Sequence, residues 1–593
     1  MASILDEDVS DDDDEEENEL PTEPRELKRI VPLARRGFQG QLLQRMTGLS
    51  LASNRAMSQP VVDWRTETAN FYSNPGDVHE NASHENTGGK SIPFCTASCN
   101  TNSLVAVGDE EGYVRLLDPS KEFSKVHLSF QAHGNAIIDL AFSEDDYLLA
   151  TASGDQTGRV IDMLTQTPVS ILAHHTASLK QVRFQPGRGS GAVLATSGRD
   201  GSVQIWDLRC SGGPVQEVAI QSESGLHHRV QKSVKSGCVV NSIYDAHVRP
   251  AKPTRAQQRA AGPGKGDVAR TGEVAGRIGE VSVTALQFLP PGREHLLLTA
   301  CEADASIKLW DIRSIHTSRH NKYSTPVSYT APPASHIAWR PFGISSMALG
   351  GNGSRLYALC KDNTVYAYST AHLALGHAPE LTPALPGGDP PRRKHHNGAA
   401  HEGLGPIYGF RHPLFHATSF YIKAAVRPQA EGRAEMLAVG SSDGCAVIFP
   451  TDERYLKDMW ARNTYNTNNN ITMPEESYLV GESTATVAGV SDSTRVTRSN
   501  GGSNLFARQA ADIPIVKNGT PLVRGHEKEV GALTWASDGR LVTVGDDYLV
   551  RCWSEEDGGR ATDLRTGGEA EGRRWGCGWA DVGDKWVGDG DDW

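Results

Sequence analysis

The stretch 175–206 reads HTASLKQVRFQPGRGSGAVLATSGRDGSVQIW, and it is the clearest copy of a unit that recurs along the chain. Short apolar runs at 179–184 and 193–197 alternate with turn residues, and Asp200 is followed six residues later by Trp206. Runs of Val, Ile, Leu and Thr bounded by Gly and Asp are typical of β-strands joined by tight turns. The stretch therefore predicts strand, turn and strand in succession.

The unit recurs as an acidic residue followed six residues later by a large apolar one. The pairs are Asp155/Ile161, Asp200/Trp206, Asp304/Trp310, Asp362/Tyr368, Asp443/Phe449 and Asp547/Trp553, with Glu111/Leu117 as a degenerate seventh copy. The acids at 111, 155 and 200 lie 44 and 45 residues apart, the length of one WD-repeat blade. Longer intervals later in the chain indicate blades followed by inserts. Seven such units can close a ring, so we predict an all-β fold: a single seven-bladed WD-repeat β-propeller with long disordered inserts and tails.

We expect three regions along the chain. Residues 1–85 are predicted to form an acidic, mostly disordered tail with a short helical segment at 26–50, and residues 86–555 to form the ring. Polar stretches without periodicity predict inserts at about 211–278, 376–405 and 452–520. We expect a strand from before the first blade to close the last one. Residues 556–593 form a Gly- and Trp-rich tail, whose tryptophans either dock a partner or pack back on the ring.

Composition excludes several classes of function. The net charge is −13, but the first nineteen residues contain eleven acids and no base, so the rest of the chain is nearly neutral. We therefore expect no direct, sequence-specific nucleic acid binding. The nine cysteines include no C-x-x-C pair, which argues against a metal site and favours a reducing, intracellular compartment. The acidic N-terminus is no signal peptide, and no apolar run is long enough to cross a membrane.

Histidines, aspartates and tryptophans of the repeats are predicted to be structural anchors. A His, a Thr or Ser, an Asp and a Trp within one blade can form a buried hydrogen-bond network that fixes a loop. The predicted anchors are His175, Asp200, Trp206, Asp304, Trp310, His526, Asp547 and Trp553. We assign no catalytic residue, metal or cofactor, because the sequence contains no recognisable catalytic triad, phosphate-binding loop or metal-ligand spacing.

Two neighbouring units end in a Trp-Asp-x-Arg box. The third ends in Trp206-Asp207-Leu208-Arg209 and the fourth in Trp310-Asp311-Ile312-Arg313. Consecutive blades would place the two Asp/Arg pairs side by side on one rim of the ring. A guanidinium there could bind carboxylates or carbonyls of a partner. The alternative is that each arginine braces its own turn through its aspartate.

The paired boxes resemble those of substrate receptors for cullin-4 RING ubiquitin ligases, and the chain is similar in particular to the denticleless family of these receptors. The similar stretches are 93–95, 110–116, 132–142, 154–157, 198–201, 206–210, 419–423 and 525–553. The second unit departs from the pattern, since Ile161 replaces tryptophan and no arginine lies two residues after Asp162. The clamp-binding box found at the end of some animal members is also missing, which puts direct clamp binding through the tail in doubt.

The resemblance implies partners and site residues. Family members bind the large DNA-damage-binding adaptor of cullin-4 ligases and recruit proteins whose degron is displayed on the replication sliding clamp. The adaptor-side candidates implied by position are Asp207, Arg209, Asp311 and Arg313, together with Leu42, Leu43 and Met46 in the helical segment. No motif identifies the degron-reading residues. The resemblance also implies nuclear residence, to which the basic run at 392–394 adds modest support.

We therefore predict a substrate-recognition subunit of a cullin-4 RING ubiquitin ligase, with no catalytic activity of its own and no membrane partner. It would recruit replication-clamp-associated proteins for ubiquitination and proteasomal degradation in S phase and after DNA damage. The alternative is a WD-repeat scaffold for a nuclear chromatin or RNA-processing complex without a role in ubiquitination. Recovery of the adaptor with the tagged protein distinguishes the two.

Overall fold

The computed structural model describes residues 63–84, 86, 88–187, 191–210, 214–220, 230–247, 281–315, 324–333, 335–336, 341–375, 401–430, 433–455, 513–556, 559–567 and 575–583. All of them belong to one compact unit, Ala52–Trp593. The predicted helical segment at 26–50, with Leu42, Leu43 and Met46, lies outside the described residues, as does the basic run at 392–394.

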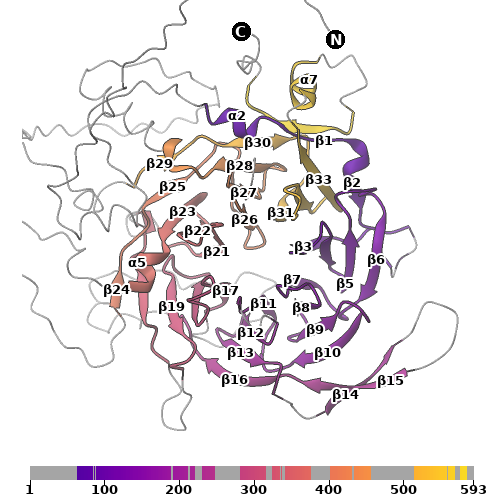
Figure 1. Cartoon of the computed structure of the whole chain (residues 1–593), viewed down its shortest axis with the longest axis vertical. Helices are drawn as coiled ribbons and strands as arrows, with labels where there is room; N and C mark the ends of the chain where they lie inside the picture. The colour runs from indigo at the N-terminus through magenta and orange to yellow at the C-terminus, as the bar shows by residue number, and fades with distance from the viewer. Residues whose placement is uncertain are drawn as a thin grey trace, which may run out of the picture. The chain divides into compact units, whose positions relative to one another are not determined.

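Seven blades of antiparallel strands follow one another around a ring, and the first strand of each blade lies nearest the centre (Figure 1). Blade 1 contains β3 (Pro93–Ser98), β4 (Val105–Asp109), β5 (Tyr113–Leu117) and β6 (Val126–Gln131). Blade 2 contains β7 (Ile137–Phe142), β8 (Leu148–Ser153), β9 (Gly158–Asp162) and β10 (Thr167–Leu172). Blade 3 contains β11 (Leu179–Phe184), β12 (Val193–Gly198), β13 (Val203–Asp207) and β16 (Cys238–Ile243). Blade 4 contains β17 (Val283–Phe288), β18 (Leu296–Cys301), β19 (Lys308–Asp311) and β20 (Ser328–Thr330).

The remaining blades complete the ring. Blade 5 contains β21 (Ile344–Leu349), β22 (Arg355–Cys360), β23 (Thr364–Ser369) and β25 (Tyr408–Phe410). Blade 6 contains β26 (Ala424–Arg427), β27 (Met436–Val439), β28 (Ala446–Pro450) and β30 (Thr520–Val523), and blade 7 contains β31 (Val530–Trp535), β32 (Leu541–Gly545) and β33 (Leu549–Glu555) with two strands from the N-terminal side. The predicted all-β propeller is confirmed.

Strands from before blade 1 form the outer edge of blade 7. β1 (Phe71–Ser73) pairs with β33 through Phe71 and Glu555, and β2 (Val78–Glu80) pairs with it through Val78 and Arg551. The short helices α2 (Arg65–Thr68) and η1 (Pro75–Asp77) flank β1. The chain thus closes the ring as expected, but the predicted boundary at 85/86 is too late. Strands of three residues carry too little periodicity to be recognised as part of a sheet.

The C-terminal region also contributes to this sheet. After α7 (Arg560–Thr566), β34 (Gly578–Ala580) lies between β30 of blade 6 and β1, which joins blades 6 and 7 into one sheet. Trp579 is buried and lies 5.3 Å beneath the Arg524 guanidinium, whereas Trp575 is 85% exposed. Trp586 and Trp593 lie outside the described residues. The region predicted as a tail at 556–593 therefore includes a strand of the ring.

The predicted inserts are too wide, because each includes strands. β16 lies inside 211–278, and in the same interval β14 (Pro214–Ile220) and β15 (Val230–Ser236) form a hairpin that pairs with β10 of blade 2. β24 (His401–Gly403), which follows α5 (Thr370–Leu375) in the chain order of elements, pairs with β20, and β29 (Ile515–Val516) pairs with β25. β24 and β29 are only three and two residues long, so their sequences resemble loops.

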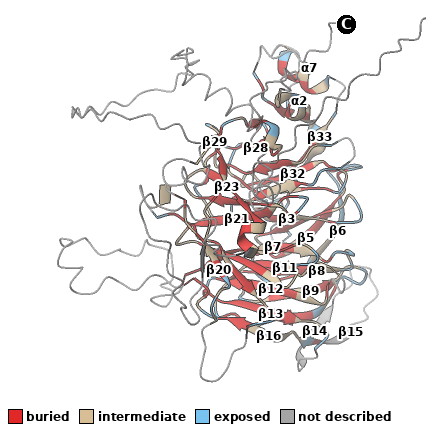
Figure 2. Cartoon of the chain, turned by 60° about the vertical axis from the view of Figure 1, so that its left-hand side comes forward, coloured by how far each residue is buried: buried red, intermediate tan, exposed pale blue. Residues whose placement is uncertain are grey.

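The core consists of apolar layers between neighbouring blades, and most strand residues are buried (Figure 2). Val105 and Val107 of blade 1 pack with Val542 and Val544 of blade 7, so the first and last blades share a core. Each buried apolar side chain of this size contributes about 1.5–3 kcal/mol. None of the described helices has the length and apolar character needed to cross a membrane.

Candidate protein-binding surfaces

The predicted anchor residues of blade 3 form a continuous hydrogen-bond relay. The Trp206 Nε1–H donates to Thr196 Oγ1 at 2.8 Å, and the same oxygen lies 2.8 Å from His175 Nε2. His175 Nδ1 lies 3.1 Å from an Asp200 carboxylate oxygen. A proton on Nδ1 satisfies every member, because the Thr196 hydroxyl can then donate to Nε2. Asp200 also accepts from the backbone N–H groups of Thr176 and Ser202, so the relay fixes two loops.

Blade 7 repeats this relay in full, and blade 2 repeats its His–Thr–Asp part. In blade 7, His526 lies 3.0 Å from Asp547 and 2.9 Å from Thr543, and Trp553 donates to the same threonine at 3.0 Å. In blade 2, His133 bonds Asp155 at 2.8 Å and Thr151 at 2.7 Å. Blade 2 has Ile161 in place of the tryptophan, and His133 was not among the predicted anchors. We interpret all of these histidines as anchors of loops, since their ring nitrogens bond within the blade.

Burial and pairing shift the protonation equilibria of these anchors. Burial lowers the pKa of His133, although its hydrogen bond to Asp155 opposes the shift. Burial raises the pKa of Asp155 and Asp200, but hydrogen bonds from His133 and His175 and from nearby backbone and hydroxyl groups outweigh it, and the pKa of each falls to about 2. The carboxylates therefore stay charged at neutral pH and hold their loops.

Blade 4 contains an incomplete version of the relay that sequence spacing did not reveal. Trp310 and His247 both bond Thr299, at 2.9 Å each, but His247 Nδ1 has no hydrogen-bond partner among the described residues. Asp304 and Cys301 have ligand atoms within 4.8 Å of it, so the structure brings together three groups of metal-binding type where none was predicted. Burial and the nearby Lys308 lower the pKa of His247 to about 3. Its position matches that of His133, His175 and His526, which supports an anchoring role.

The two Trp-Asp-x-Arg boxes have the same internal geometry. Arg209 donates from Nε and Nη2 to Asp207 at 2.9 and 2.7 Å, and Arg313 does so to Asp311 at 3.0 and 2.9 Å. The side chains of Arg209 and Arg313 remain 70% and 64% exposed. These hydrogen bonds lower the pKa of Asp207 and Asp311. Each arginine thus braces its own turn, as the alternative stated, and also presents its guanidinium to solvent.

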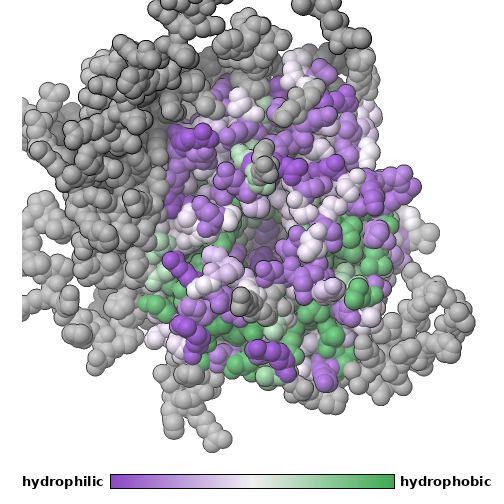
Figure 3. All heavy atoms as spheres, viewed as in Figure 1, coloured by the Kyte–Doolittle hydropathy of each residue, from purple (hydrophilic) through white to green (hydrophobic). Residues whose placement is uncertain are grey.

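Both boxes lie on one face of the ring, which we call the box face. Each box consists of the last two residues of the third strand of its blade and the first two of the turn that follows, whereas the anchoring Asp precedes that strand and lies on the opposite face, the anchor face. Blade 3 is tied to blade 4 on the box face, because Asn241 Nδ2 donates to Ile312 O at 3.0 Å and Gln185 Nε2 to Glu294 O at 2.8 Å. In the view of Figure 3, hydrophobic residues gather over the lower part of the ring and at its right-hand side, and the upper part, over blades 6 and 7, is more hydrophilic.

On the anchor face, the segment 417–423 reaches the centre of the ring. The sequence of residues 419–423 resembles the first strand of blade 6, but β26 begins only at Ala424. The Tyr421 ring stacks on Phe94 of blade 1 at 5.6 Å and lies 5.8 Å from the Lys180 ammonium of blade 3. Burial lowers the pKa of Lys423 to about 8. The alternating apolar residues resemble a strand, but they contact other blades instead.

A hollow of about 510 Å³ lies beside this segment, between blades 4, 5 and 6. Phe342, Phe420, Glu302 and Asp362 are among the residues that line it. The Lys361 ammonium lies 3.7 Å from the centre of the Phe420 ring. Pockets of this size are large enough to bind small ligands or peptide side chains.

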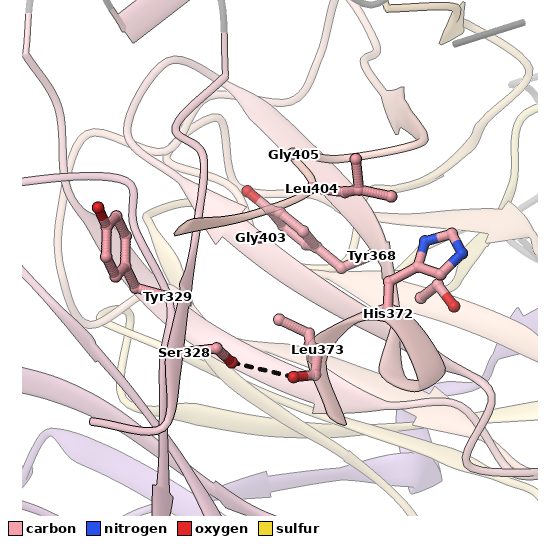
Figure 4. Close-up of a pocket in the computed structure, with 9 residues that line it drawn as sticks. Ser328, Tyr329, Tyr368, His372, Leu373, Gly403, Leu404 and Gly405 are labelled. Atoms are coloured by element: carbon pink, nitrogen blue, oxygen red, sulfur yellow. Dashed lines mark hydrogen bonds between the residues drawn. The ribbon is translucent and has the colours of Figure 1, made fainter. Parts of the chain in front are cut away.

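A second hollow, between α5 and β24, is much smaller (Figure 4). Its volume of about 10 Å³ is enough for about one water molecule. The Tyr368 hydroxyl and His372 Nε2, which line it, have no partner among the described residues, and a water there could bond both. Ser328 Oγ donates to Leu373 O at 3.0 Å across its floor. This cavity has no room for a substrate.

Comparison with known proteins agrees with the blade structure. The family described as WD domain, G-beta repeat matches residues 124–162, 166–207 and 519–554. Each matched segment begins at the outer strand of one blade and ends at the third strand of the next: β6 to β9, β10 to β13, and β30 to β33. The sequence repeat is therefore offset by one strand from the structural blade.

Several curated proteins are similar over longer regions. Cell division cycle protein cdt2 of Schizosaccharomyces pombe is 27% identical over 503 residues, which cover 82% of this chain and 73% of that protein. Denticleless protein homolog of Danio rerio is 31% identical over 47% of this chain and 38% of its own length. The Homo sapiens homolog is 31% identical over 50% of this chain and 36% of its own length. The matched region thus spans well under half of these vertebrate relatives.

Proposed function

We propose that this chain, a WD-repeat homologue of the denticleless and Cdt2 proteins, is the substrate-recognition subunit of a cullin-4 RING ubiquitin ligase. In this role it binds the large DNA-damage-binding adaptor and recruits proteins whose degron is displayed on the replication sliding clamp. Their ubiquitination follows in S phase and after DNA damage, in the nucleus. The chain supplies binding and positioning, and the ubiquitin-transfer chemistry belongs to its partners.

The observation that carries this proposal is the pair of exposed, oriented guanidinium groups. A guanidinium has five N–H donors, and Arg209 and Arg313 use Nε and Nη2 for their own aspartates. Within the described residues no other hydrogen-bond acceptor pairs with either group. The Nη1 donors are therefore held at a fixed orientation toward solvent, where they can bond carboxylates or carbonyls of an adaptor with little further ordering.

The free energies involved indicate that the two Asp/Arg pairs serve binding rather than folding. Exposed ion pairs contribute only about 0–1 kcal/mol to folding stability. A hydrogen bond between a charged guanidinium and a partner at an interface contributes more, about 1.5–3 kcal/mol. Removing Arg209 or Arg313 should therefore change association far more than it changes the free energy of unfolding.

The two faces give the molecule a physical mechanism for a receptor. An adaptor bound at the box face leaves the anchor face open, where the hollow beside Phe420 could receive a substrate segment. Holding substrate and ligase on one rigid ring raises the local concentration of the target lysine near the charged ubiquitin-conjugating enzyme. The interblade core keeps the distance between the two faces constant.

The test is adaptor binding by the tagged full chain, with Arg209→Glu and Arg313→Glu combined. We expect the purified adaptor to bind the wild type and its affinity to fall at least about 100-fold in the double variant, which corresponds to about 2.7 kcal/mol. Arg454 provides a control of the same charge and exposure, because it lies at the end of blade 6, donates from Nε to Asp452 Oδ2 at 2.6 Å and is 64% exposed. Arg454→Glu should bind normally.

Mass spectrometry of the captured proteins tests the alternative, a WD-repeat scaffold without a role in ubiquitination. If the wild type never recovers the adaptor, and the double variant loses no partner, the chain is a scaffold without a role in ubiquitination. Equal losses in the double variant and in Arg454→Glu would show that charge on the box face, not the two neighbouring boxes, determines binding.

A further inference from the structure

Blade 2 repeats the local geometry of the two boxes at the same place on the box face. The backbone N–H of Leu164 donates to Asp162 Oδ1 at 2.9 Å, as that of Arg209 does to Asp207 at 2.9 Å and that of Arg313 to Asp311 at 3.0 Å. The middle residue of each turn also donates to the preceding hairpin: Met163 to Tyr147 O, Leu208 to Ala192 O and Ile312 to His295 O. Leu164 therefore occupies the position that arginine occupies in blades 3 and 4.

In blade 2 the side chain at this third position is apolar and exposed, and so is a neighbouring side chain. Leu164 is 73% exposed, and Tyr147, in the hairpin to which its turn is bonded, is 57% exposed. We call these two residues the blade-2 apolar pair. Loops on a ring rim are normally polar, so two large apolar side chains at adjacent turns are a departure that folding of the described residues does not explain.

The blade-2 apolar pair is continuous with the surface of blade 3. Gly187 N, in the first hairpin of blade 3, donates to Glu144 Oε2 in the first hairpin of blade 2 at 3.2 Å. A Cβ at Gly191 would lie 3.5 Å from Leu148 and Ser143, so the two hairpins are in direct contact. Asn241 and Gln185 then connect blade 3 to blade 4 on the same face. Leu164, Arg209 and Arg313 thus follow one another along three connected blades.

We infer that the blade-2 apolar pair binds the same partner as the two guanidinium groups, through an apolar surface of that partner next to its carboxylates or carbonyls. The inference rests on the proposed function. A stable interface buries about 800 Å² on each partner and combines an apolar centre with arginines and tyrosines. A single partner covering blades 2 to 4 would contact the apolar pair and both arginines together, and its contact with Leu164 explains why this position is apolar.

The experiment measures adaptor binding by purified full chain carrying Leu164→Asp, Leu164→Arg or Leu164→Met. We expect Leu164→Asp to weaken binding about tenfold and Leu164→Met to preserve it. Leu164→Arg gives blade 2 the arginine that blades 3 and 4 have at this position. If Leu164 makes an apolar contact with the adaptor, this variant should bind more weakly. If binding depends only on positive charge along the rim, it should bind more tightly. Leu414, which is 40% exposed on the anchor face, gives the control Leu414→Asp, which should bind like wild type.

Unchanged binding by Leu164→Asp, with loss of binding by Arg209→Glu and Arg313→Glu, overturns this inference and leaves the proposed function intact. Failure of the wild type to bind the adaptor overturns both. A change of oligomeric state in Leu164→Asp, seen by light scattering without a change in adaptor binding, assigns the pair to contact between copies of the chain and also overturns the inference. Matching thermal midpoints of all variants verify that they fold.

Discussion

At the residue scale, one buried threonine in each complete relay hydrogen-bonds two other side chains at once. Thr196 is fully buried, and its hydroxyl bonds both Trp206 and His175. The sequence allowed the histidine, aspartate and tryptophan of this relay to be predicted, because each belongs to a recurring spacing. The threonine could not be separated from other strand threonines, since its role depends on which side chain faces it across the blade.

Thr196→Val tests the energetic role of the relay. The substitution keeps the shape of the side chain but leaves the Trp206 N–H and His175 Nε2 without partners, and each unsatisfied buried group costs about 1–3 kcal/mol. We expect the free energy of unfolding to fall by about 2–4 kcal/mol in urea denaturation. Thr176→Val, at an exposed position of the same loop, should change it by less than about 0.5 kcal/mol. Equal effects would show that the relay adds nothing beyond ordinary packing.

At the element scale, central strands were predictable and edge strands were not. Strands such as β12 and β18 are buried apolar runs followed by a turn aspartate, so the sequence identifies them. β1, β24, β29 and β34 have two or three residues each, and their place in the sheet depends on pairing with distant strands. The segment 419–423 differs in the other direction. Its alternating apolar residues resemble a strand, but β26 begins only at Ala424, and the aromatic side chains of the segment contact other blades. Register between distant segments is a tertiary property that local patterns do not specify.

The strand β34 gives a test at this scale. Trp579 packs against Leu564 and Cys577 and beneath Arg524, between the sheets of blades 6 and 7. Trp579→Ala should therefore lower the free energy of unfolding by about 3 kcal/mol, in the range for large buried side chains. It should also speed amide hydrogen exchange in β1 and β30, which flank β34. Trp575→Ala, at an 85% exposed position three residues from β34, is the control and should behave like wild type. If the amide hydrogens of both variants exchange at the same rate, β34 does not stabilise the sheet that joins blades 6 and 7.

At the scale of the whole molecule, the ring separates two surfaces by the length of its strands. The paired boxes could be predicted to share a rim, because a recurring unit in consecutive blades repeats its geometry. The hollow on the anchor face could not be predicted, since it depends on residues from three blades and on the segment 417–423 reaching the centre. The proposed receptor function depends on both surfaces being accessible at once.

Phe420→Ala combined with Lys361→Ser tests this separation. These side chains form one wall of the hollow and contact each other, whereas the boxes lie on the opposite face. The variant should bind the adaptor with wild-type affinity but capture a clamp-bound substrate about tenfold more weakly, a change of about 1.4 kcal/mol. Reconstituted ubiquitination of a clamp-associated substrate on DNA-loaded clamp measures the second effect, and Arg209→Glu with Arg313→Glu should abolish conjugation by loss of the adaptor instead. Normal conjugation by the Phe420 and Lys361 variant would mean that the substrate is read elsewhere on the chain. Weakened adaptor binding in that variant would mean that the two faces are not independent.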